Sequence, residues 1–160
     1  MKKIIIASIA GVVAGIILTS MSMAIMMPKM MLHERESPLG YAETVKHLEA
    51  AVTNGGWGIS RKMNMTKSIA RFGKTVPPVT LLKICQADYA ARILNTDEAM
   101  YVSVMMPCTL AVYQKSNGKT FVSTMNMGLM GRMFGGVVAE VMVGPVAADV
   151  KKFTAFLERK

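Results

Sequence analysis

Residues 109–126 read TLAVYQKSNGKTFVSTMN and predict a β-hairpin. The two arms, Thr109 to Lys115 and Thr120 to Asn126, are rich in β-branched and aromatic residues, which favour strands. They are joined through Ser116-Asn117-Gly118, and an Asn-Gly step suits a tight turn whose backbone needs positive φ angles. The hairpin therefore predicts that this chain folds around an antiparallel sheet.

Amphipathic helices are predicted on both sides of the hairpin in the sequence. Apolar residues recur at helical spacing over 41–52 and again from Pro145, which is expected to open the last helix, to Leu157. Two apolar stripes that face one sheet indicate an α+β domain. Further strands are expected at 57–65, 79–85 and 100–106, with a loop at 66–78 and a short helix at 87–94.

The N-terminus predicts a membrane anchor. Lys2 and Lys3 precede an uncharged, mostly apolar run from Ile4 to Met27 that would rise about 36 Å as a helix, more than the roughly 30 Å of a hydrocarbon core. Lysines at the extreme N-terminus favour a cytoplasmic start. The sequence thus predicts a single-pass transmembrane helix at 1–28 in a bacterial inner membrane and one exported domain at 29–160 in the periplasm.

A cleaved signal peptide is the alternative for the same segment. The apolar core from Ile4 to Leu18 has signal-peptide length, and Ser22-Met23-Ala24 resembles a cleavage site. The apolar run continues to Met27, past that site, which favours a retained anchor. Under either interpretation the folded domain is exported.

The charge distribution predicts a partner with negative charge. The formal net charge is +9, and the segment between Glu49 and Asp88 holds six basic residues and no acidic one. Such a field attracts anionic headgroups, an acidic protein or an anionic small molecule, and a solvated face is the alternative. Nucleic acid is a poor fit because aromatic residues do not interleave with the basic ones. We call Arg61, Lys62, Lys67, Arg71 and Lys74 the basic patch.

Three segments carry a family resemblance: KICQADYA at 83–90, MPCTLAVY at 106–113 and FVSTMN at 121–126. Together with the helix at 41–52 and the Gly-Trp-Gly-Ile strand after it, they resemble the domain-of-unknown-function family 302 over about residues 35–157. The resemblance implies a small α+β domain, a curved antiparallel sheet backed by helices as in the TATA-binding-protein-like fold, and often a homodimer. It implies no activity, because the family has no established common one. The family often has Asn-Pro where this chain has Gln86-Ala87.

Sulfur-containing side chains are the candidate ligands. Cys85 and Cys108 are the only cysteines, and structural thiols, a disulfide, a metal ligand and a reactive thiol all remain open for them. Seventeen methionines suggest either core packing or thioether ligands for Cu(I) or haem iron. The best candidates for binding haem or copper are Cys108, Met106 and Met125, followed by Cys85.

Catalytic motifs are missing from the sequence. His33 and His47 have neither zinc-ligand spacing nor a triad, and the carboxylates are few and scattered. An enzyme is therefore the less favoured class. We expect a membrane-anchored extracytoplasmic module that forms a homodimer and docks a small ligand or a protein, either periplasmic or from a membrane complex. The alternative is a haem- or copper-binding redox or metal-handling protein.

Overall fold

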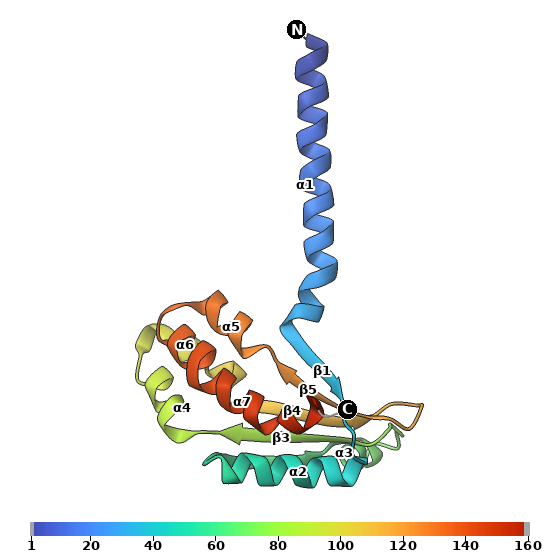
Figure 1. Ribbon diagram of the computed structural model, residues 1–160, viewed down its shortest axis with the longest axis vertical. Helices are drawn as coiled ribbons and strands as arrows, with labels where there is room; N and C mark the ends of the chain where they lie inside the picture. The colour runs from blue at the N-terminus through green and yellow to red at the C-terminus, as the bar shows by residue number, and fades with distance from the viewer. Residues whose placement is uncertain (1, 159–160) are drawn as a thin grey trace. The chain divides into compact units, whose positions relative to one another are not determined.

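The computed structural model describes residues 2–158, with side chains described at 11–27 and 29–158. The chain divides into two units, one that ends at Met31 and one that begins at Leu32. The first is a single helix, α1, Lys2–Met31 (Figure 1). The second is an α+β domain built on a five-stranded sheet. An α+β domain was predicted for residues 29–160.

The predicted transmembrane helix and location are not supported. Within residues 11–27 and 29–158, no helix is both long and apolar enough to cross a membrane. This finding overturns the predicted single-pass placement in a bacterial inner membrane with a periplasmic domain. The start of the predicted anchor, residues 1–10, lies outside the described side chains.

The sheet contains the predicted hairpin at its centre. Its strands are antiparallel and lie in the order β1-β5-β4-β3-β2. β4 and β5 pair around the predicted turn, where Gly118 has a φ of 78° that glycine adopts without a steric penalty. β1 is an unpredicted edge strand beside β5. The bounds are β1 Leu32–Glu36, β2 Gly58–Asn64, β3 Val79–Cys85, β4 Cys108–Gln114 and β5 Thr120–Met125.

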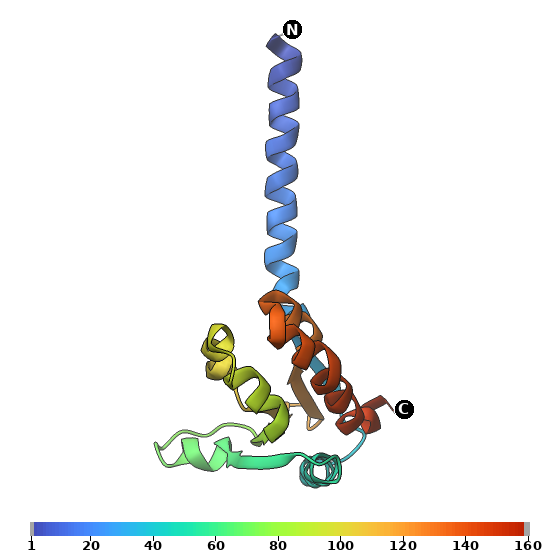
Figure 2. The same ribbon diagram turned by 90° about the vertical axis from the view of Figure 1, so that its left-hand side faces the viewer.

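Two helices supply the predicted apolar stripes and cover one face of the sheet. α2, Tyr41–Asn54, buries Val45, Leu48 and Val52, and α7, Ala147–Phe153, buries Val150 and Phe153. Figure 2 shows α2 end-on. Because strand side chains alternate between faces, every second residue of the central strands joins these helices in one core. The strand residues of this core are Leu82, Ile84, Leu110, Val112 and Val122.

The chain between β5 and α7 is helical (Figure 2). It forms α5, Met127–Phe134, then α6, Gly136–Val141, then the π-helical turn η2, Met142–Val146. Pro145 was expected to open the last helix but lies inside η2. Proline has no N–H to donate, and the altered hydrogen bonding of a π turn accommodates it within the helical run.

Two other predicted elements are wrong, and one is confirmed. Residues 100–106, expected as a strand, fall largely in the 3-10 helix η1, Asp97–Met105, because a short apolar run fits either structure. The expected loop at 66–78 begins within α3, Met65–Ala70, where the Asn64 side chain caps the helix. The predicted short helix is α4, Ala87–Leu94. The described chain ends in η3, Ala155–Glu158.

Candidate functional site

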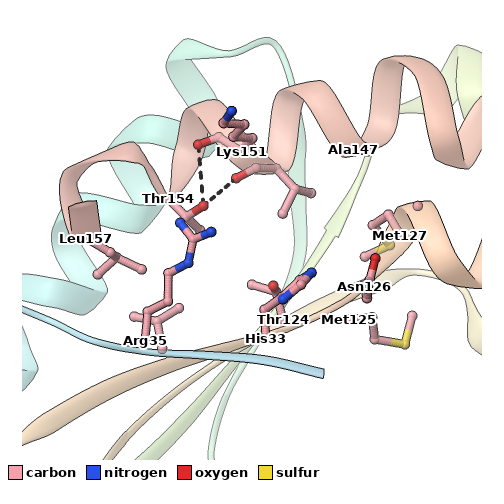
Figure 3. A pocket seen from close by; sticks show the side chains of 13 residues that line it. His33, Arg35, Thr124, Met125, Asn126, Met127, Ala147, Lys151, Thr154 and Leu157 are labelled. Carbon is pink, nitrogen blue, oxygen red and sulfur yellow. Dashed lines mark hydrogen bonds between the residues drawn. The ribbon is translucent and has the colours of Figure 1, made fainter. Parts of the chain in front are cut away.

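A cavity of about 190 Å³ lies between the β1–β5 edge of the sheet and α7 (Figure 3). We call it the basic cavity because its basic lining residues are His33, Arg35 and Lys151. Its neutral polar lining consists of Thr124, Asn126 and Thr154, and its apolar lining includes Val122, Met125, Met127, Ala147, Val150 and Leu157. The cavity therefore combines a cationic part with an apolar part.

β1 places two of the basic residues of the cavity, His33 and Arg35. His33 and Arg35 are two residues apart on a strand, so their side chains lie on the same face of the sheet. They pair with Thr124 and Val122 of β5, which also line the cavity. Figure 3 shows Arg35 extending from β1 toward Thr154. The Nη1 atom of Arg35 also forms an ion pair with Glu158 at 2.8 Å.

α7 places the third basic residue of the cavity, Lys151. Lys151 follows Ala147 by four residues and precedes Thr154 by three, so the three residues share one helical face. Among the side chains at 11–27 and 29–158, no carboxylate lies within ion-pair distance of Lys151, whereas its neighbour Lys152 pairs with Asp149 at 3.1 Å. Among the described residues, Lys151 thus brings a positive charge without a carboxylate partner to the cavity wall.

The electrostatic balance of the basic cavity favours an anion. No carboxylate belongs to its lining within the described part of the chain. The N-terminal end of α5 also borders it, and the positive end of a helix dipole favours negative charge. Its apolar wall suits a hydrocarbon body. The arrangement can therefore bind an organic anion.

A second, smaller pocket gathers sulfur atoms. It measures about 30 Å³, and we call it the Cys–Met pocket after the residues Cys85, Cys108, Met105, Met106 and Met142 that line it. Both cysteines are free thiols, so the disulfide alternative is not realised. Burial raises the pKa of the Cys108 thiol to about 11, with a smaller contribution from the nearby Cys85. Cys108 therefore holds its proton at neutral pH.

The structure groups three of the four predicted ligand residues and separates the fourth. Cys85, Cys108 and Met106 line the Cys–Met pocket, whereas Met125 lines the basic cavity. Sequence reasoning missed Met142, whose place depends on the helical run after β5, and it missed the three basic residues of the basic cavity. The alternation of His33 and Arg35 was the available signal for two of those residues.

The basic patch is exposed. All five of its residues lie at the surface, but they belong to β2, α3 and the segment after α3 rather than to one loop. Lys62 is neutralised by Glu49 through an ion pair of 2.7 Å. Neither of the two cavities includes a residue of the patch.

Of the two predicted cofactors, haem and copper, only a copper ion is small enough for the Cys–Met pocket. A cavity of about 30 Å³ admits an ion or a group the size of one or two waters, but not a haem macrocycle. Within residues 11–27 and 29–158, no three His, Cys, Asp or Glu side chains cluster as a metal site would require. Any metal in the Cys–Met pocket would therefore need thioether ligands beside the two thiols.

Comparisons with known proteins agree with the resemblance read from the sequence. The family model "Domain of unknown function DUF302" matches residues 33–157. A crystal structure of an uncharacterized conserved DUF302 protein from Bacillus stearothermophilus is 29% identical, with a TM-score of 0.65 over 81% of this chain and 97% of that chain. No curated protein matches.

Proposed function

This chain belongs to the DUF302 family, and we propose that its domain is a binding module that holds a small organic anion in the basic cavity. One observation carries the proposal: His33, Arg35 and Lys151 line one cavity whose described lining includes no carboxylate. Arg35 is paired with Glu158, whereas Lys151 has no carboxylate within ion-pair distance among the described residues. An anionic ligand would place an opposite charge beside the Lys151 ammonium.

The size and the apolar wall of the cavity narrow the ligand class. An engineered protein cavity of about 150 Å³ binds benzene, and the basic cavity measures about 190 Å³. A benzoate-sized carboxylate therefore fits, with its ring against Val122, Val150 and Leu157 and its charge toward the cations. Charge-assisted hydrogen bonds to the carboxylate would fix its orientation.

The direct test is calorimetric titration of the purified full chain with sodium benzoate. We expect saturable binding, weaker binding of benzyl alcohol because it lacks the charge, and weaker binding of inorganic phosphate because it lacks the ring. Lys151→Gln should weaken benzoate binding because it removes a cation from the cavity wall. Lys152→Gln is the matched control, since Lys152 is the next residue, pairs with Asp149 and does not line the cavity.

Two outcomes would contradict this function. Equal affinities for benzoate and benzyl alcohol would show that the cations do not select the ligand. Equal losses in the Lys151 and Lys152 variants would show a general effect of protein charge, not a site at the cavity.

Docking of a protein partner through the basic patch stays a prediction. Phe72, beside Arg71, is 83% exposed, and an exposed aromatic ring among cations suits a contact surface. Replacing Arg61, Lys67 and Arg71 by Gln should leave folding intact and abolish recovery of an acidic partner.

The predicted homodimer is tested by light scattering of the purified full chain. A measured mass equal to that of one chain would contradict the homodimer.

A further inference from the structure

We propose that the Cys–Met pocket is a Cu(I) site in which the sulfurs of Cys85, Cys108 and Met106 are the ligands. It is independent of the anion site, because the two cavities share no lining residue. The pocket lies where β3 ends and β4 begins, and the end of η1 and the start of η2 close it.

The two thiols belong to neighbouring strands and line the same pocket. Ile84 pairs with Cys108 across β3 and β4, so Cys85 is one residue beyond the partner of Cys108. Met106 is two residues before Cys108 and lines the same pocket.

The chemistry of the lining selects a soft monovalent ion. Thiolate and thioether sulfurs favour Cu(I), whereas Zn²⁺ sites use thiolate, imidazole and carboxylate ligands and are usually four-coordinate. The lining includes no His, Asp or Glu among the described residues. Met105 and Met142 add two further thioethers to the wall of the pocket.

The surroundings suit a complex of low charge that is shielded from water. Trp57 and Tyr89 line the pocket together with aliphatic side chains, and an apolar shell limits the access of solvent and oxidants to a metal. Lys83 lies two residues before Cys85 on the same face of β3, and its positive charge would partly offset the negative charge of two thiolates on one Cu(I). Each thiol that binds the ion releases its proton to solvent, and no electron is transferred.

The test is anaerobic competition for Cu(I) between the purified full chain and a chromophoric Cu(I) chelator. We expect the wild-type chain to withdraw one equivalent of Cu(I). The Cys85→Ser, Cys108→Ser double variant should lose about 100-fold or more in affinity. Met125→Leu is the matched control, because Met125 lines the other cavity and its loss should leave Cu(I) affinity unchanged.

A second variant and a second readout keep the test decisive if the double variant unfolds. Met106→Leu is close to volume-conserving and should fold normally, yet it removes one proposed ligand and should weaken Cu(I) binding. X-ray absorption of the loaded wild-type chain should show sulfur scatterers alone. Nitrogen or oxygen ligands, or Cu(I) affinity that is the same in the Met106 and Met125 variants as in the wild type, would overturn the proposal.

Discussion

The indole Nε1 of Trp57 donates a hydrogen bond to Oδ2 of Asp149 at 3.2 Å, which joins the start of β2 to α7. The Trp57 side chain is 4% exposed and makes edge-to-face contacts with Phe153 and Tyr89, at centroid distances of 5.7 and 5.9 Å. One side chain therefore links the sheet to α7 and to α4. It also lines the Cys–Met pocket.

Removing the Trp57 side chain should be costly. Trp57→Ala leaves a large cavity between the sheet and its helices and is expected to lower the free energy of unfolding by about 3–5 kcal/mol. Trp57→Phe keeps most of the apolar contact but leaves Asp149 without the indole N–H, so a smaller loss of about 1–3 kcal/mol is expected. Urea unfolding followed by far-ultraviolet circular dichroism measures both, and wild-type stability in Trp57→Ala would refute the packing described above.

A close helix approach at Gly131 gives a second prediction. A Cβ at this position would lie 2.9 Å from Cβ of Met142 and 2.9 Å from Cγ2 of Val143, so α5 and η2 would have to separate. Gly131→Ala should therefore cost about 1–3 kcal/mol. Gly128→Ala is the control in the same helix, because a Cβ there makes only an ordinary contact of 3.6 Å with Asn126. Equal thermal unfolding of the two variants would contradict the close approach.

The parts of the fold that follow from local pattern were predictable from the sequence. The Asn117-Gly118 turn and the strand-forming residues in its arms predicted the hairpin. The apolar residues at helical spacing predicted α2 and the residues of α7. β1 was missed because it is a short edge strand with basic or acidic residues on both faces. His33 and Arg35 lie on one face, and Glu34 and Glu36 lie on the other. Such a strand has no apolar alternation to detect.

The candidate sites were only partly predictable, because each depends on how distant segments pack. The basic cavity needs Arg35 and Lys151 to meet across more than a hundred residues, and no local pattern contains that information. Cys108 and Met125 lie at the same end of the hairpin, but they line different cavities. The helical run from α5 to α7 contributes different residues to each cavity and so divides that end into two.

The carboxylate of Glu34 should contribute to the raised pKa of the Tyr113 hydroxyl. The Tyr113 hydroxyl donates to Oε1 of Glu34, and Lys115 donates to Oε2 at 2.9 Å. Burial, and then the bond to Glu34, raise the pKa of Tyr113 above its ordinary value of 10.0. Because the unfolded tyrosine ionises first, this group stabilises the fold below pH 10, and its contribution is lost as the pH rises through the raised folded pKa.

Glu34→Gln should lower the pKa of Tyr113, because it removes the negative charge that opposes the phenolate. The measurement is an ultraviolet titration of tyrosine ionisation, with Tyr113→Phe to assign the transition. Glu36→Gln is the control, since Glu36 pairs with Lys119 instead, at 2.9 Å. A transition that does not move in Glu34→Gln would mean that burial alone sets this pKa.

The ion pair between Arg35 and Glu158 should compete with the proposed anion. The pair is 2.8 Å long with side chains 40% and 52% exposed, so its loss should change the free energy of unfolding by less than about 1 kcal/mol. Glu158→Gln releases Arg35 to a bound carboxylate, and benzoate affinity should rise about two- to fivefold, with a smaller gain at high salt. Glu140→Gln, which breaks the pair with Arg92 at 3.1 Å, is the control and should leave affinity unchanged. Benzoate affinity that is unchanged in Glu158→Gln would show that Arg35 does not contact the anion, and would leave Lys151 as the cation of the site.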